Sequence, residues 1–241
     1  MLIRSLALAA ALAGWGAQAA AAELRFITLD VAPWASIDPA SGQPVGVFPS
    51  VVREIARRSG HTITMSLQPF TRIDRELEAG TQDCTIIVWN DSRGSIVERG
   101  ELVSDHPMGV IARQGVRLKA YEDLKGLTIS VLRGLSIQPR FDTDSGLVKD
   151  FDVDYGQGLA KMEHNRLDAI AGAVPTILYL AKQRGMSDML GDVLPLGTIP
   201  LVLQCSRASP HLGLTPDLNK AVRDMRDDGT LQRILEENHF T

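Results

Sequence analysis

Residues 61–89 read HTITMSLQPFTRIDRELEAGTQDCTIIVW, and this stretch decides the fold class. Residues 61–67 alternate apolar and polar side chains, which predicts a half-buried strand. A helix is expected between Thr71, as its N-cap, and Gly80, as its stop. The apolar run from Cys84 to Trp89 is typical of a strand buried on both faces. This strand–helix–strand order predicts a parallel sheet.

The same alternation continues in both directions along the chain. Upstream, residues 24–29 read as a strand and residues 49–59 as a helix that Gly60 ends. Downstream, strands are expected at 108–112, 127–132, 151–155, 167–171 and 201–205, and helices at 121–126, 158–165, 175–184, 215–229 and 230–237. Two successive α/β units indicate two lobes. Ligands of such folds bind beyond the carboxyl ends of strands or between the lobes.

The N-terminus has the layout of a secretory signal peptide. Arg4 supplies a positive charge, residues 5–16 are apolar, and small residues at 17–22 place the cleavage after Ala19 or Ala22. The apolar run is too short and too rich in Ala for a permanent membrane span. We therefore expect residues 1–22 to be removed and the protein to be exported to the periplasm.

Composition argues against several classes of function. The net charge is −4 without a basic block, which argues against nucleic-acid binding. The five His are scattered, and no G-x-S-x-G elbow occurs, so neither a metal site nor a serine hydrolase is expected. Gly156-Gln157-Gly158 lacks the third glycine of the dinucleotide fingerprint and reads as a strand-to-helix loop. We expect no cofactor.

Six short motifs follow one another in a recognisable order, at Gly42–Phe48, Leu77–Asp83, Ser104–Pro107, Glu122–Gly126, Arg166–Ala169 and Asp228–Leu231 with Ile234. Through them the chain resembles the family 3 periplasmic solute-binding proteins, the amino-acid-type receptors of ABC transporters, from residue 24 to 240. The resemblance implies a two-lobed type II periplasmic-binding-protein fold of the α/β class. Each lobe would be a mostly parallel sheet flanked by helices, with two strand crossovers as the hinge. Lobe 1 would comprise residues 23–106 plus 202–241, and lobe 2 residues 107–201.

The resemblance also implies where a ligand binds. With two arginines added from strand-to-helix loops, the candidate contacts are Asp30, Trp34, Phe70, Arg72, Trp89, Asn90, Arg93, Arg99, Arg133, Gly134, Ser136 and Ala173. Either Arg93 or Arg99 would grip a carboxylate, and residues 134–136 would be a helix start whose N–H groups hold an anion. Ala173 stands where the family has the Asp that binds an α-amino group. A carboxylate-bearing solute without an obligatory ammonium group is therefore expected.

Plainer interpretations of these residues stay open. Trp34, Phe70 and Trp89 could pack on the sheet instead, and the arginines could lie on solvated helix faces. The resemblance makes the strands of Cys84 and Cys205 neighbours, which fits either a disulfide or two buried thiols.

The predicted function is that of a monomeric periplasmic binding protein. It would close its lobes on a small polar or anionic solute and deliver it to an ABC permease in the membrane, without catalysing a reaction. One alternative is a binding protein that docks onto a membrane sensor. Another is an exported cyclohexadienyl-dehydratase-like enzyme with Asp30 or Asp91 as its acid.

Overall fold

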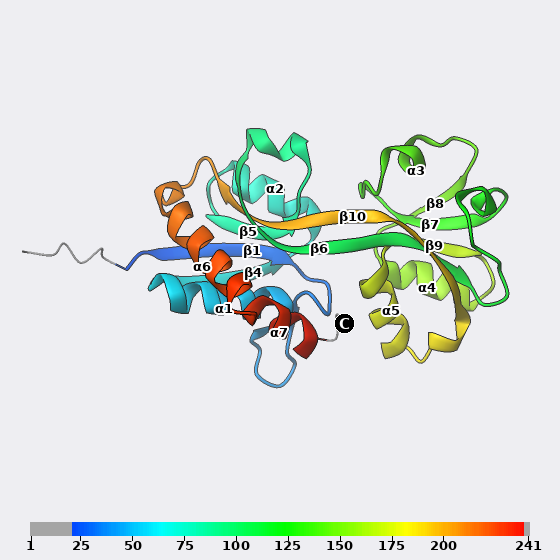
Figure 1. The fold of residues 1–241 in the computed structure, drawn as a ribbon, viewed down its shortest axis with the longest axis horizontal. Helices are drawn as coiled ribbons and strands as arrows, with labels where there is room; N and C mark the ends of the chain where they lie inside the picture. The colour runs from blue at the N-terminus through cyan, green and yellow to red at the C-terminus, as the bar shows by residue number, and fades with distance from the viewer. Residues whose placement is uncertain (1–20, 239–241) are drawn as a thin grey trace, which may run out of the picture.

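An eight-stranded sheet of order β4-β1-β5-β10-β6-β9-β7-β8 organises the protein. The computed structural model describes residues 21–238, except the side chains of Phe70 and Thr71, so the predicted signal peptide lies almost entirely outside the described residues. Two 17-residue strands, β6 (Val97–Arg113) and β10 (Leu190–Ser206), pair antiparallel in the middle of the sheet. They extend from one group of elements into another and so join the two groups (Figure 1).

The first group surrounds the N-terminal half of β6. Here β1 (Glu23–Leu29) pairs in parallel with β4 (Thr62–Gln68) and β5 (Cys84–Val88). The flanking helices are α1 (Val47–Ser59), α2 (Phe70–Glu78), α6 (Thr215–Asp227) and α7 (Thr230–Glu237). A short hairpin, β2 (Ser36–Ile37) with β3 (Pro44–Val45), lies between β1 and α1, and the 3₁₀ turns are η1 (Asp91–Ser95) and η4 (Leu212–Leu214).

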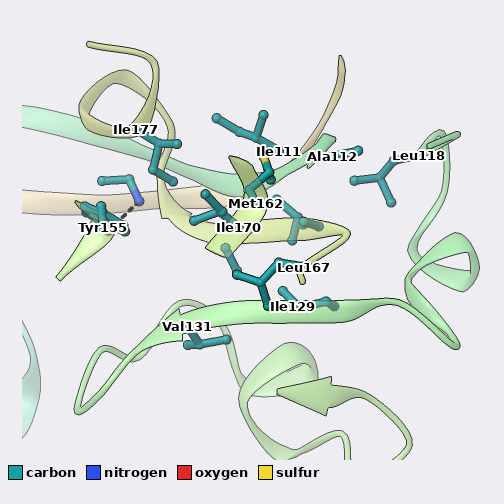
Figure 2. Close-up of a cluster of buried hydrophobic side chains, with 14 of the residues drawn as sticks. Ile111, Ala112, Leu118, Ile129, Val131, Tyr155, Met162, Leu167, Ile170 and Ile177 are labelled. Atoms are coloured by element: carbon teal, nitrogen blue, oxygen red, sulfur yellow. Dashed lines mark hydrogen bonds between the residues drawn. The ribbon is translucent and has the colours of Figure 1, made fainter. Parts of the chain in front are cut away.

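The second group surrounds the other half of β6. Here β7 (Thr128–Leu132) pairs in parallel with β8 (Val148–Asp152) and β9 (Ala169–Ala173). The flanking elements are α3 (Pro139–Thr143), α4 (Tyr155–Glu163), α5 (Val174–Gln183), η2 (Tyr121–Leu124) and η3 (Ser187–Met189). Apolar side chains of these strands and helices, such as Ile111, Ile129 and Ile170, form a core separate from that of the first group (Figure 2).

The structure corrects four sequence predictions. The strands expected at 108–112 and 201–205 are parts of the long strands β6 and β10. The strand expected at 151–155 instead ends at Asp152, and Tyr155 already belongs to α4. The reason is that the Asp154 carboxylate accepts a hydrogen bond from the Gln157 N–H and caps this helix. Residues 156–158 therefore form the first turn of α4 and not a loop before it.

Cys84 and Cys205 face each other across β5 and β10 and form a disulfide. Of the two states that the sequence left open, the structure shows the bonded one. The bridge connects the third strand of the first group to the strand that returns to it after the second group. It therefore ties together chain segments that are 121 residues apart in the sequence.

Candidate ligand-binding site

A cavity of about 640 Å³ lies between the two groups of elements. From the first group it is bordered by residues 29–32 at the end of β1, by Trp34 and by Phe48. The second group contributes residues 132–135 and 153–156 and the start of α5. Side chains of β6 and β10 close the remaining wall. Because both groups border the same space, a molecule inside it would touch both.

Trp34 is the residue that joins the two sides. Gly46, at φ +114°, lies so close to the Trp34 backbone that a Cβ there would be 2.8 Å from the Trp34 carbonyl oxygen. The Phe48 N–H donates to that same oxygen at 2.9 Å, and the two rings stack with centroids 5.0 Å apart. Across the cavity, the Trp34 indole N–H donates to Thr176 Oγ1 of α5 at 2.9 Å. The indole is therefore fixed on one side and hydrogen-bonded to the other.

Tyr155 and Ala173 form part of the wall opposite Trp34. The Ala173 N–H donates to Tyr155 Oη at 2.9 Å, the hydrogen bond drawn at Tyr155 in Figure 2. Gly172 makes room for the phenol, since a Cβ at this residue would be 2.3 Å from Tyr155 Oη. Burial raises the pKa of Tyr155 to about 12, so the phenol keeps its proton at neutral pH.

His106 borders the cavity from β6 and is only 5% exposed. Its ring meets Trp34 edge to face, with centroids 4.7 Å apart. Its Nδ1 is buried and has no hydrogen-bond partner among residues 21–238. Desolvation by burial lowers the pKa of His106 to about 4, so the imidazole is neutral at physiological pH.

Charged side chains occupy the outer edge of the cavity. Arg133 and Arg184 border it, and so do Asp30 and Asp154, all four exposed to solvent. Arg184 donates to the Gly156 carbonyl at 2.7 Å, and Asp154 caps α4. The inner wall, in contrast, consists of apolar side chains and uncharged polar groups. A charged group of a ligand would therefore find its charged partners at the outer edge.

Of the eleven candidate residues whose side chains the structure describes, five border the cavity: Asp30, Trp34, Arg133, Gly134 and Ala173. Gly134 lies in a turn, at φ +82°, and the predicted helix start at 134–136 is wrong, because α3 begins at Pro139. Proline suits the first position of a helix and pushes the residue before it into an extended conformation. Ser136 is outside the cavity lining and donates to Asp142 Oδ2 at 2.6 Å.

Neither arginine proposed as the carboxylate clamp borders the cavity. Arg93 is 4% exposed; it donates to Gln204 Oε1 at 2.7 Å and forms an ion pair with Asp74. Desolvation lowers the pKa of Arg93, and the Asp74 carboxylate opposes this change. Arg99 lies over the ring of Trp89, 5.2 Å from its centroid. Both guanidinium groups therefore have partners within the protein.

The other candidates have local roles. The Trp89 indole N–H donates to Asp91 Oδ1 at 2.9 Å, and neither residue borders the cavity. Asn90 caps η1 by accepting a hydrogen bond from the Ser92 N–H. Arg72 is exposed and donates to the side chain of Gln68 at 3.0 Å. The side chain of Phe70 lies outside what the structure describes.

Sequence reasoning missed six polar residues of the cavity: Gln68, His106, Asp154, Tyr155, Thr176 and Arg184. His106 was visible only as part of a crossover motif, and Tyr155 was placed at the end of a strand. Thr176 directly follows Pro175, and the sequence predicted a helix start there, close to the end of a strand. That prediction placed Thr176 near the expected ligand site, but it did not say what its hydroxyl faces.

The fold and the cavity define a two-lobed binding protein. Two α/β lobes joined by two long strands enclose a cavity that both lobes border. The chain belongs to the family of bacterial extracellular solute-binding proteins, family 3, whose pattern it matches over residues 24–240. Among residues 21–238, no helix combines the length and apolar character that crossing a membrane requires. In the same described part, no cluster of three or more His, Cys, Asp or Glu could hold a metal ion.

Similar proteins fit this assignment. The chain is 21% identical over 204 residues to the probable amino-acid-binding protein YxeM of Bacillus subtilis (strain 168), covering 81% of this chain and 76% of that protein. An ancestral arginine-binding protein bound to glutamine has a similar structure, with a TM-score of 0.76, 20% identity and coverage of 91% and 98%. A histidine kinase sensor domain with similarity to periplasmic binding proteins has a TM-score of 0.77, 17% identity and coverage of 90% and 95%. The predicted family and the type II fold are confirmed.

Proposed function

We propose that this protein is a periplasmic receptor that captures a small solute between its lobes and delivers it to an ABC permease. The observation that carries the proposal is the cavity bordered by both lobes, with Trp34 hydrogen-bonded across it to Thr176. A solute in this space binds the closed state better than the open one, so it shifts the population toward closure. The permease would then recognise the closed form.

The lobe boundaries belong to the same proposal. Lobe 1 would comprise residues 23–106 plus 202–241, and lobe 2 residues 107–201. Both boundaries fall inside the long strands β6 and β10. The register of their pairing is irregular at four places along β10, between Leu190 and Val193, Pro195 and Gly197, Leu201 and Val202, and Val202 and Gln204. The last two lie at the proposed boundary in β10, where the strand would bend.

The solute is expected to carry a negative charge at one end. Arg133 and Arg184 border the outer part of the cavity, and guanidinium groups bind carboxylates well. Arg133 has no ion pair with any residue that the structure describes, so its charge remains available to a ligand. The deeper wall is largely apolar, which favours a ligand with an apolar body behind its charged end.

An uptake assay tests this function. The gene would be deleted in its host and replaced by wild type or by Ala173→Phe, which fills the cavity wall. The substrates would be isotope-labelled organic acids and amino acids. Wild type should restore uptake of one solute, and the cavity-filling variant should not. Uptake that is unchanged by the deletion, for every solute that the purified protein binds, would contradict the delivery step.

A sensing role is the second candidate, because the chain has a structure similar to a histidine kinase sensor domain. In that case the deletion would leave uptake intact but would abolish a transcriptional response to the same solute. An enzymatic role would show as chemical change of the solute on incubation with the purified protein. A general acid would have to lie in the cavity; of the two acids considered, Asp30 borders it and Asp91 does not.

A further inference from the structure

Two hydroxyl groups of the inner wall accept hydrogen bonds within the protein but donate none to the residues that the structure describes. Tyr155 Oη accepts from the Ala173 N–H, and Thr176 Oγ1 accepts from the Trp34 indole. Each hydroxyl also has one proton to donate, and neither proton has an acceptor among the residues that the structure describes. Both side chains border the cavity, with Tyr155 7% and Thr176 1% exposed. Two buried O–H donors are thus left for a ligand.

His106 adds a third polar group to this wall. Its ring is 95% removed from solvent, borders the cavity and carries an unpaired Nδ1. A neutral imidazole has one N–H and one acceptor nitrogen, and the tautomer can follow the ligand. Because Nδ1 is buried, a ligand in the cavity would reach the other ring nitrogen, Nε2, which can carry the N–H.

A carboxylate is missing from the same part of the wall. The two carboxylates that border the cavity, Asp30 and Asp154, are both exposed, and Asp154 already caps α4. Ala173, whose N–H donates to Tyr155 Oη, borders the cavity directly before the ten-residue helix α5 and has only a methyl group as its side chain. The positive end of a helix disfavours a cation in its neighbourhood. An ammonium group here would lose its water without gaining a charged partner.

We propose that Tyr155, Thr176 and His106 form a donor site for a ligand oxygen, either a carbonyl or a second carboxylate. The ligand class is therefore an organic acid with an oxygen acceptor near its carboxylate, such as a 2-oxo acid or a substituted malonate. The carboxylate would lie toward Arg133 and Arg184, and the acceptor oxygen would receive the two O–H protons. This inference rests on the proposed function, since it takes the cavity to be the ligand site, and it names the chemistry that the cavity selects.

The test compares molecules that differ only at the group in question. Each set contains an amino acid, the 2-oxo acid of the same skeleton, and the malonate in which a second carboxylate replaces the ammonium group. Sets built on the phenylalanine, leucine and glutamate skeletons would be titrated into the full mature protein by calorimetry at neutral pH. In the set that binds, an oxygen-bearing member should bind about 100-fold more tightly than the amino acid.

Four variants separate the donor site from general effects on folding. Thr176→Val removes one O–H donor and should weaken the preferred acid about 10-fold, whereas Thr176→Ser keeps it and should change affinity less than about 2-fold. Trp34→Phe also loses the Trp34–Thr176 bond but leaves the Thr176 O–H in place, so a smaller loss of affinity than in Thr176→Val shows the contribution of that O–H beyond the bond across the cavity. Ala173→Asp places a carboxylate beside the donors and should reverse the preference toward the amino acid. Thermal unfolding of each variant identifies those that fail to fold.

Each result decides the inference. Tighter binding of the oxo acid or malonate, with reversal in Ala173→Asp, supports it, and the preferred member tells a carbonyl from a carboxylate. Tighter binding of the amino acid, or binding of no member of any set, overturns it. Native mass spectrometry of the purified protein distinguishes failure of the donor site from failure of the proposed function. A co-purified solute of other chemistry would leave the receptor role standing while the donor site falls.

Discussion

Replacing Trp34 by Phe tests whether the hydrogen bond across the cavity holds the lobes together. The variant keeps an aromatic ring over Phe48, where the present centroid distance is 5.0 Å, but removes the indole N–H that donates to Thr176 Oγ1. Both residues are buried, at 5% and 1% exposure, so water replaces the lost partner poorly in the closed state. We therefore expect closure to become less favourable.

The size of the effect follows from the contact that is lost. A neutral hydrogen bond contributes about 1 kcal/mol net, and a buried partner left unsatisfied brings the cost to about 1–2 kcal/mol. That corresponds to a fall of about 5- to 30-fold in the ratio of closed to open molecules. In the open state both groups are hydrated, so the change acts on closure and not on the folding of either lobe.

Spin labels at Ser41→Cys and Lys182→Cys would measure the distance between the lobes by pulsed electron resonance. Both positions are exposed, and the native cysteines are joined in a disulfide, so they do not react with the label. The short-distance population should shrink in Trp34→Phe. Trp89→Phe is the matched control, because it removes an indole N–H that bonds Asp91 within lobe 1. An unchanged distance distribution in Trp34→Phe would show that the Trp34–Thr176 hydrogen bond does not hold the lobes together.

Three further predictions concern stability. Labelling of the unfolded, unreduced protein should find no free thiol, and finding free thiols would disprove the disulfide. The double variant Cys84→Ala, Cys205→Ala should have a free energy of unfolding in urea about 3–5 kcal/mol lower, because the bridge closes a long loop. Hydrogen bonding to Arg57, opposed by desolvation, lowers the pKa of Glu54 from 4.5 to about 2, so this pair stabilises the fold above about pH 4.5 and is lost as the pH falls toward 2. Glu54→Gln should cost about 1 kcal/mol at neutral pH and flatten that acid slope; an equally steep slope would argue against it. Burial lowers the pKa of His106 from 6.5 to about 4, so the unfolded state takes up the proton first and stability falls as the pH drops from 6.5 to 4. His106→Phe should remove up to about 3 kcal/mol of this dependence, and identical urea midpoints for both proteins across that range would count against a buried neutral imidazole.

Most of the fold was predictable because its signals are local. Alternation in residues 61–67 and the apolar run from Cys84 mark strands without help from distant residues. The helix expected at 230–237 has the bounds observed for α7, because Gly229 at φ +78° ends the preceding helix sharply. The length of β6 and β10 was not predictable, since the two strands pair with residues far away in the sequence and no local pattern marks such pairing.

The site was predicted less well, for reasons that are also physical. Residues placed in the loop after β1, such as Trp34, border the cavity because the backbone there is held by Gly46. Arg93 does not, because it pairs with Asp74, which lies 19 residues away in the sequence, and no local pattern announces that contact. Tyr155 was missed because it was expected at the end of a strand. With Asp154 as the N-cap, Tyr155 is instead the first residue of α4, and it borders the cavity.

A crystal structure of the protein with its bound solute would show whether the cavity between the lobes is the ligand site. We expect electron density for one small molecule in that cavity, in contact with Trp34 and Thr176 and within hydrogen-bonding distance of Tyr155 or His106. Its charged end should lie toward Arg133 and Arg184. A solute bound elsewhere on the chain, for example beside Arg93 and Trp89 with the cavity filled only by water, would show that the cavity is not the ligand site.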